Sequence, residues 1–188
     1  MDIHPTPETW LRAVLADFSG FLQDHASCEK KASGMALSIA SHYPDRPKLL
    51  NAMAELAVEE LSHYREVVKL LTRKGLHPGA DSKDPYINQL NELIRRGSEY
   101  FLLDRLLLAA VIERRGNERF GLVAANLSDA PDKRFYQSIA ASEDRHWQLF
   151  VQLAKDECPH LDASARLAEL ISAEASIMLQ QPPRAALH

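Results

Sequence analysis

The sequence predicts an all-α protein built around four long helices, and three observations carry this prediction. Residues with high helix propensity, chiefly Leu, Ala, Glu, Lys and Arg, are plentiful in a chain of 188 residues that contains only 7 glycines. Apolar residues recur with helical spacing in each long segment, and no segment reads as a convincing strand. Clusters of Pro, Gly and Asp separate these segments and mark the turns.

The first half of the chain is predicted to form two helices joined by a short turn. The stretch TPETW is typical of a helix start, with Thr6 as N-cap and Pro7 in the first helical position. Helical periodicity then continues to about Tyr43, with a bend expected near Gly20. After the turn YPDRP, a second helix is expected over about residues 46–74.

The second half repeats this plan after a longer connection. The segment GLHPGADSKDP is the predicted crossing loop, and helical periodicity resumes over about residues 85–126, with a bend near Gly97. The stretch NLSDAPD is the next short turn, and a fourth helix is expected over about residues 131–157, before Pro159 stops it.

The predicted elements combine into a single domain over residues 1–188. Two antiparallel helix pairs joined by a crossover are a known four-helix bundle topology, and this bundle would occupy about residues 8–158. An extra terminal helix is expected over about residues 161–180, followed by a loose tail over residues 181–188.

The composition is that of an ordinary globular protein. Apolar residues make up 46% and charged residues 26%, and the formal net charge of -4 announces no nucleic-acid or membrane partner. No apolar run reaches the roughly 20 residues of a membrane span, and the stretch MDIHPTPETW lacks the basic start and apolar core of a signal peptide. Cys28 and Cys158 form no metal or redox spacing, so a cytoplasmic, reducing location is the simplest interpretation.

The most informative motif is a glutamate followed three residues later by a histidine, in a helix that otherwise looks buried. It occurs as Glu60 and His63 in EELSHY, and as Glu143 and His146 in SEDRHW. Positions i and i+3 share one face of a helix, so both side chains of a pair point the same way. A buried carboxylate is costly unless it is paired or bound to a metal, so two such pairs indicate a metal site.

Each of the other two long helices offers one glutamate on an apolar stripe, Glu29 and Glu113. In an antiparallel hairpin, two residues lie level when they are equally far from the turn. The midpoint between Glu29 and Glu60 falls inside YPDRP, and the midpoint between Glu113 and Glu143 falls inside NLSDAPD. Each half of the chain is therefore expected to bring one glutamate level with one Glu-x-x-His motif.

A third match to the motif, Glu157 and His160, is excluded. It contains Pro159, where a helix should end, and no glutamate is level with it. The alternative is that the two retained pairs are surface residues of a helical bundle that binds no metal. The turn midpoints argue against that alternative, because they were not used to select the pairs.

Four carboxylates and two imidazoles inside one bundle are the ligand set of di-iron and di-manganese carboxylate proteins. These donors suit iron or manganese, and the absence of cysteine ligands argues against zinc-thiolate or iron–sulfur sites. Two divalent ions would offset the four negative charges, and two irons would supply electrons that activate dioxygen. The predicted metal ligands, which are also the predicted catalytic residues, are Glu29, Glu60, His63, Glu113, Glu143 and His146.

Several neighbouring residues have two interpretations. His25 lies one turn before Glu29, where a solvated or core histidine is favoured over a partner of the ligand. Tyr64 and Tyr136 are expected to be core residues rather than redox groups. Several positions near the ligands on the inward faces of the helices carry small residues, which fits either close helix packing or a substrate pocket. They are Ala36, Ala109, Ala110, Gly116 and Ala140.

Longer stretches around these motifs resemble one family, the tRNA 2-methylthio-isopentenyladenosine hydroxylases. The likeness is strongest at CEKKA, at the DRP turn and at EELSHY, continues through IERRGNERF and SEDRHWQLF, and covers about residues 21–158. The resemblance implies a ferritin-like fold with a non-haem di-iron centre held by the same six residues. It also implies an enzyme that uses dioxygen to hydroxylate the isopentenyl group of a hypermodified adenosine next to the anticodon of tRNA.

The residues alone leave other functions open. An iron oxidase or iron store, a peroxide-reducing protein, a quinone hydroxylase and a metal-free helical adaptor are the alternatives. The chain has no four-cysteine module of a complete rubrerythrin, and no membrane-facing amphipathic helix is obvious. It also lacks a G-x-G-x-x-G dinucleotide motif, so an external electron-transfer partner is expected, and the oligomeric state is left open.

Basic residues follow each of the single glutamates and offer contacts for RNA. Residues one and two places after an inward glutamate turn about 100° and 200° away from it, so they are expected on the outside of the bundle. There they would form either a solvated charged face or phosphate contacts for an unpaired RNA loop. The basic residues concerned are Lys30, Lys31, Arg114, Arg115, Arg119, Lys133 and Arg134.

Overall fold

The computed structural model describes residues 2–188, and over this range the chain forms seven α-helices and no strand. The all-α prediction is confirmed, and both predicted short turns join consecutive long helices. The bends expected near Gly20 and Gly97 are complete breaks, at Asp17 and over residues 93–97. The helices are α1 Glu8–Ala16, α2 Phe18–His42, α3 Pro47–Arg73, α4 Pro85–Glu92, α5 Ser98–Asn126, α6 Ala130–Glu157 and α7 Ala163–Gln180.

Four aspartates start helices by accepting hydrogen bonds from backbone N–H groups of the first turn. They are Asp17 before α2, Asp84 before α4, Asp129 before α6 and Asp162 before α7. Such a cap satisfies a donor that has no partner inside the helix and is worth about 1 kcal/mol. The aspartates therefore help to fix where these four helices begin, including the start of α2 after the break that follows α1.

The chain divides into two compact units, which we describe separately. The hairpin unit comprises residues 13–82 and 184–187, and the larger unit comprises the chain up to Arg12, residues 83–183 and His188. The single domain expected over residues 1–188 stays a prediction.

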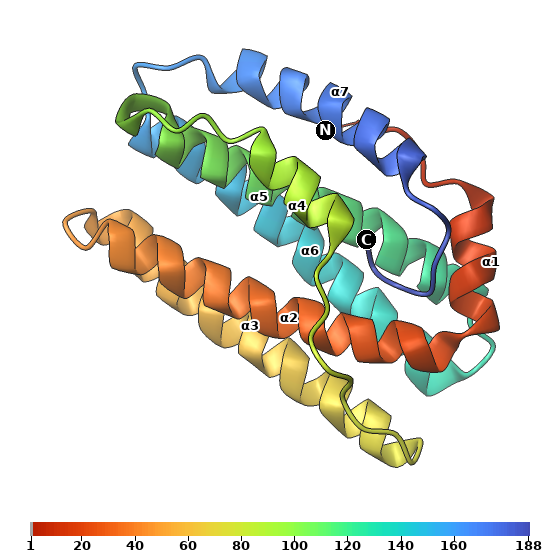
Figure 1. The fold of residues 1–188 in the computed structure, drawn as a ribbon. Coiled ribbons are helices and arrows are strands. Elements are labelled where there is room, and N and C mark those ends of the chain that lie inside the picture. The colour runs from red at the N-terminus through yellow and green to blue at the C-terminus, as the bar shows by residue number, and fades with distance from the viewer. Residues whose placement is uncertain (1) are drawn as a thin grey trace. The chain divides into compact units, whose positions relative to one another are not determined.

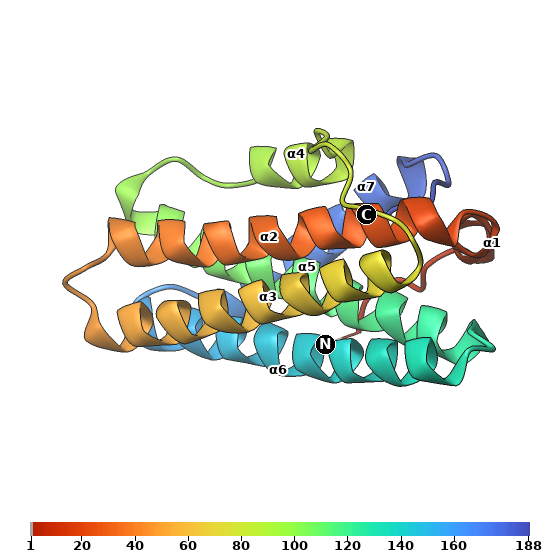
Figure 2. The ribbon, with the colours of Figure 1, turned by 90° about the horizontal axis from the view of Figure 1, so that it is seen from below.

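In the hairpin unit, α2 and α3 run antiparallel and side by side (Figures 1 and 2). The turn between them spans residues 43–46, as the sequence predicts. Both helices bury an apolar stripe, and the same faces carry buried His25, Glu29 and Glu60. Apolar members of the stripes include Phe21, Leu22, Ala26, Ile39, Leu49, Met53, Leu56 and Val67.

The crossing loop leaves α3 and lies along the outer face of α2, as Figure 1 shows. Four polar side chains of α2 hold it there: Gln23, Ser27, Lys30 and Lys31. Lys30 Nζ lies 2.8 Å from Asp81 Oδ2, and Lys31 donates to the carbonyl of Ser82 at 3.0 Å. These two lysines of the predicted basic set are thus exposed, but their ammonium groups bind the crossing loop.

In the larger unit, α5 and α6 form the second antiparallel hairpin. Helix α7 packs against α5, and α4 packs against α7 (Figure 1). Helix α5 is therefore covered on several sides, and most of its residues are buried, including charged Asp104, Arg115 and Arg119.

The segment after α7 differs from the loose tail that the sequence predicts. Ala186, Leu187 and His188 are all buried. The Leu187 N–H donates to Asp24 Oδ2 at 2.7 Å, and the His188 ring stacks on Tyr86 with centroids 5.2 Å apart. Among the helices of residues 2–188, none combines the length and hydropathy needed to span a membrane.

Candidate metal centre

The hairpin unit brings Glu29, Glu60 and His63 together, as the turn midpoint predicts. Glu29 comes from the middle of α2, while Glu60 and His63 lie one turn apart on α3. His63 Nδ1 lies 3.3 Å from Glu60 Oε2 and 3.5 Å from Glu29 Oε2. One ligand atom from each residue falls within a 4.8 Å cluster, so the three can share a metal ion. We call them the α2–α3 half-site.

His25 extends this half-site, contrary to the interpretation favoured from the sequence. Its Nε2 lies 2.6 Å from Glu29 Oε1, and its side chain is fully buried. An ionised carboxylate only accepts hydrogen bonds, so Nε2 carries a proton and donates a hydrogen bond to Glu29. Phe21, one turn earlier on α2, stacks its ring on the imidazole at a centroid distance of 6.2 Å.

Hydrogen bonds between opposite charges hold the side chains of the α2–α3 half-site together. Burial alone would raise the pKa of Glu29, but hydrogen bonds from His25 and His63 hold it well below its usual value. Burial alone would lower the pKa of His63, but hydrogen bonding to Glu29 and Glu60 raises it to about 10. A protonated His63 therefore offsets part of the negative charge of the two carboxylates, and metal binding must displace its proton.

The larger unit contains a second half-site with the same design. Glu113 comes from α5, and Glu143 and His146 lie one turn apart on α6. His146 Nδ1 lies 3.8 Å from Glu113 Oε2 and 3.8 Å from Glu143 Oε2. All three side chains are buried. We call these residues the α5–α6 half-site.

Small residues stand next to the carboxylates of the α5–α6 half-site. A Cβ atom placed on Gly116 would lie 3.7 Å from both Cγ and Oε2 of Glu143. Ala109 occupies the position one turn before Glu113. Next to Gly116, Asn117 ties the two helices together by donating from Nδ2 to the carbonyl of Ala140 at 2.7 Å.

The residues set aside from the sequence also lie as expected. Helix α6 ends at Glu157, and His160 is exposed beyond it, so this third motif forms no helical pair. Tyr136 is fully buried and contacts Phe120, with ring centroids 5.7 Å apart, as a core residue would.

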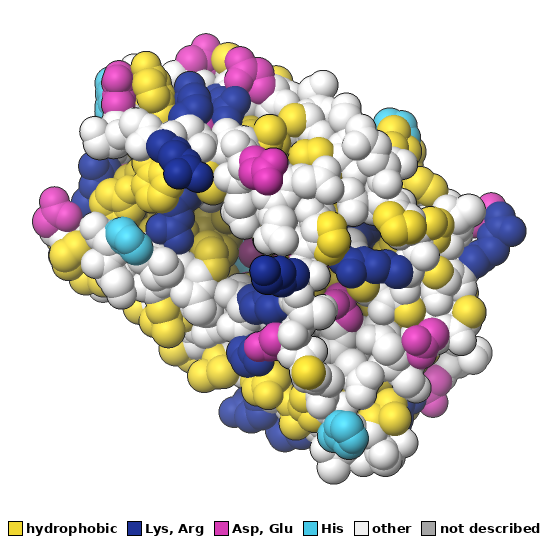
Figure 3. All heavy atoms as spheres, in the orientation of Figure 1, with side chains coloured by type: hydrophobic (Ala, Val, Ile, Leu, Met, Phe, Trp, Pro, Cys, Tyr) yellow, Lys and Arg dark blue, Asp and Glu magenta, His cyan; other side chains and the backbone are white. Residues whose placement is uncertain are grey.

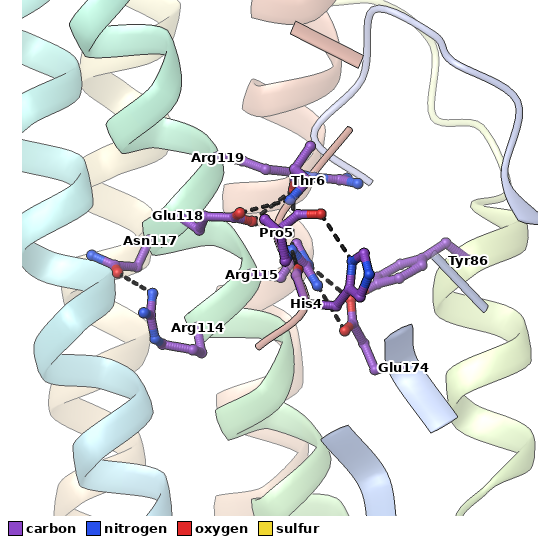
Figure 4. Close-up of polar contacts among 10 residues, drawn as sticks. All are labelled: His4, Pro5, Thr6, Tyr86, Arg114, Arg115, Asn117, Glu118, Arg119 and Glu174. Atoms are coloured by element: carbon purple, nitrogen blue, oxygen red, sulfur yellow. Dashed lines mark hydrogen bonds and ion pairs between the residues drawn. The ribbon is translucent and has the colours of Figure 1, made fainter. Parts of the chain in front are cut away.

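The prediction that Arg115 and Arg119 lie on the outside is wrong. Arg115 is 0% and Arg119 3% exposed. Arg115 donates from Nε and Nη2 to the two carboxylate oxygens of Glu174 on α7, each at 2.8 Å, and from Nη1 to the carbonyl of His4 (Figure 4). Helix geometry turns Arg115 away from Glu113 as expected, but α7 and the N-terminal segment cover that face.

Glu174 and Glu118 complete this buried network, and sequence reasoning missed both. Glu174 also accepts from the Tyr86 hydroxyl at 2.8 Å, and Glu118 accepts from both the N–H and the hydroxyl of Thr6 at 2.7 Å (Figure 4). Thr6 thus binds a side chain of α5 instead of serving as the expected N-cap. The available signal for Glu174 was its spacing of four residues from both Leu170 and Met178, on the stripe of α7 that is buried.

The exposed basic residues do not gather into one patch on the face shown in Figure 3, where Lys and Arg side chains are spread among acidic and apolar ones. Lys30, Lys31 and Arg134 are exposed, as predicted. Arg114 is half-buried and donates to Asn117 Oδ1 at 2.6 Å. No single surface for RNA follows from the charges alone.

The chemistry of the donors fits iron or manganese. Each half-site offers two carboxylates and one imidazole, which suit iron or manganese, and neither contains a cysteine. Cys28 lies 3.7 Å from Asp24 Oδ2, and Cys158 is the residue after α6, outside both half-sites. Burial of the carboxylates favours a bound cation, because buried negative charge needs compensation.

Helical hairpins that each present a glutamate beside a Glu-x-x-His motif define the ferritin-like class of carboxylate proteins. A solved structure agrees: the chain is similar to "Protein 43 with aldehyde deformylating oxygenase activity from Synechococcus", with a TM-score of 0.91 and 33% sequence identity. The match covers 98% of this chain and 93% of that one. The predicted fold class is confirmed.

The chain belongs to the tRNA-(MS[2]IO[6]A)-hydroxylase (MiaE) family, whose model matches residues 3–188. It is 38% identical to the tRNA 2-(methylsulfanyl)-N(6)-isopentenyladenosine(37) hydroxylase of Pseudomonas putida, over 95% of this chain and 86% of the relative. It is 30% identical to the hydroxylase of the same name from Salmonella typhimurium, over 70% of this chain and 48% of that protein. The resemblance seen in the sequence is confirmed.

Proposed function

We propose that the protein is a non-haem di-iron monooxygenase that hydroxylates the isopentenyl group of 2-methylthio-isopentenyladenosine next to the tRNA anticodon. Family membership over residues 3–188 is the observation that carries this proposal. The two half-sites support it with the donors that a di-iron centre needs. The comparisons favour a hydroxylase over an iron oxidase, peroxide-reducing or iron-storage protein, because both curated relatives are named tRNA hydroxylases.

In this proposal each half-site supplies ligands for a di-iron centre. Bound iron would supply the electrons that activate dioxygen, as redox cofactors do generally. Hydroxylation inserts one oxygen atom of dioxygen into a C–H bond of the isopentenyl group and reduces the other atom to water, with uptake of two electrons and two protons. The electrons come from an external electron-transfer partner. The proposed ligands are Glu29, Glu60, His63, Glu113, Glu143 and His146.

The chain prepares the site by excluding water and leaving space. Apolar residues such as Leu56, Ile139 and Phe150 are buried near the ligands along their helices, which strengthens electrostatic interactions inside the site. Ala109 and Gly116 are small residues of α5 near its proposed ligand, and we place the isopentenyl group beside them. An unpaired loop base can reach a protein site without the breaking of base pairs. The proposed tRNA substrate places the enzyme in the cytoplasm.

Nucleoside mass spectrometry tests the proposed reaction directly. In tRNA from cells that lack the protein, we expect the hydroxylated nucleoside to disappear and 2-methylthio-isopentenyladenosine to accumulate. The wild-type chain should restore hydroxylation, whereas a Glu60→Ala chain should not, because it lacks one proposed ligand. Identical nucleosides with and without the protein would refute the proposed substrate.

Turnover is expected to require both dioxygen and an external reductant. With isotopically labelled dioxygen, the product should carry one labelled oxygen atom, because the balanced reaction takes the hydroxyl oxygen from dioxygen and not from water. Mass spectrometry of the product nucleoside measures this incorporation. Hydroxylation under strict anaerobiosis without peroxide, or label arriving from water, would contradict a monooxygenase.

A further inference from the structure

His25 is a buried, chemically capable side chain to which the proposed reaction assigns no role. Its imidazole is fully buried in the hairpin unit, and Nε2 is 2.6 Å from Glu29 Oε1. The other oxygen of that carboxylate, Oε2, faces the second helix, 3.5 Å from His63 Nδ1. The two oxygens of Glu29 are therefore divided between two different partners.

We infer that His25 is a positioning residue, which holds Glu29 Oε1 and leaves Oε2 to bind metal in a fixed orientation. This inference rests on the proposed di-iron centre. The hydrogen bond from His25 fixes the orientation of the carboxylate and draws electron density from Oε1, so Oε2 is the oxygen that we expect to bind metal. Hydrogen bonds of this kind orient ligands and tune the metals that they hold.

The α5–α6 half-site has no histidine at the position that corresponds to His25. Ala109 stands four residues before Glu113, as His25 stands four residues before Glu29. Alanine offers no side-chain donor, so the sequence gives Glu113 no imidazole one turn away on its own helix. The two half-sites match in their proposed ligands but differ in the residue one helical turn before the single glutamate.

A histidine that merely fills the core would act differently from a positioning residue. A filler contributes packing, which leucine can replace, whereas a positioning residue contributes an N–H at a defined place. Glutamine restores that N–H, because its amide nitrogen is as many bonds from the backbone as Nε2 of histidine. Comparison of the leucine and glutamine variants therefore separates the hydrogen bond from the packing.

The test is iron titration of the metal-free full-length protein, combined with Mössbauer spectra of the loaded protein. His25→Leu is expected to weaken binding of one of the two iron equivalents by about 10- to 100-fold and to change the spectrum of one iron environment. His25→Gln should recover most of both. Ser33→Ala is the matched control, because Ser33 lies one turn after Glu29 and donates to the carbonyl of Ala57 at 2.8 Å, so its loss perturbs the same hairpin without touching a ligand.

Two outcomes would overturn the inference. In the first, folded His25→Leu protein binds both iron equivalents with the affinities and spectrum of the wild type. In the second, Ser33→Ala causes the same selective loss as His25→Leu, which would make the effect one of hairpin stability. In either case wild-type protein that binds two irons and hydroxylates tRNA leaves the proposed function intact, whereas wild-type protein without iron would refute the function and the inference together.

Discussion

Replacing Glu113 or His146 by alanine is expected to abolish both tight iron binding and tRNA hydroxylation. Each change removes a proposed ligand from a buried half-site, so the remaining side chains would offer the metal ion one donor fewer. Loss of an outer partner of a metal ligand costs about 10- to 100-fold in affinity, so loss of the ligand itself should exceed about 100-fold. Iron content after dialysis and tRNA turnover by mass spectrometry measure the two effects.

His160→Ala supplies the matched control for His146→Ala. Both histidines follow a glutamate by three residues, but His160 is exposed and lies beyond the end of α6. Iron content and turnover of this variant should equal those of the wild type. Full iron occupancy in Glu113→Ala protein, or iron loss in His160→Ala protein, would contradict the proposed set of ligands.

Replacing Arg115 by methionine is expected to lower the free energy of unfolding by about 3–5 kcal/mol, because it leaves Glu174 as a buried charge without its guanidinium partner. Urea unfolding of the variant and the wild type measures the difference. An Arg134→Met variant is the control, since this arginine is exposed on α6 and its loss should change stability by less than about 0.5 kcal/mol.

The double variant Arg115→Met with Glu174→Leu should regain much of the lost stability, because replacing both members of a buried ion pair by apolar groups is often close to neutral. A single Arg115→Met variant as stable as the wild type would show that the network is not held as Figure 4 depicts it. The same burial means that reversing the charge of Arg115 would test folding and not RNA binding.

Much of the fold could be predicted because local signals determined it. Apolar periodicity predicted the long helices, and Pro and Asp predicted where they end. Equal distance from a turn predicted that Glu29 lies opposite Glu60, and Glu113 opposite Glu143, in each hairpin. These rules need only the geometry of one helix or one hairpin, and within each hairpin the structure brings the predicted partners within about the reach of one metal ion.

What the sequence could not give depends on contacts between distant segments. The direction of Arg115 was predicted correctly, but its surroundings depend on α7, which packs against α5 from more than fifty residues further along the chain. A histidine one turn before a glutamate can be solvated or can bind that glutamate. The sequence around His25 does not distinguish these two environments. The burial of Ala186, Leu187 and His188 likewise depends on partners such as Asp24 and Tyr86.

Gly116 shows how activity and stability can oppose each other at a single position. A glycine inside a helix costs about 1 kcal/mol relative to alanine, so Gly116→Ala would by propensity alone make α5 more stable. Its new methyl group would then stand 3.7 Å from the carboxylate of Glu143 and fill space next to a proposed ligand. Selection for thermal stability alone would favour the alanine, whereas selection for an adaptable carboxylate and a roomy site would keep the glycine.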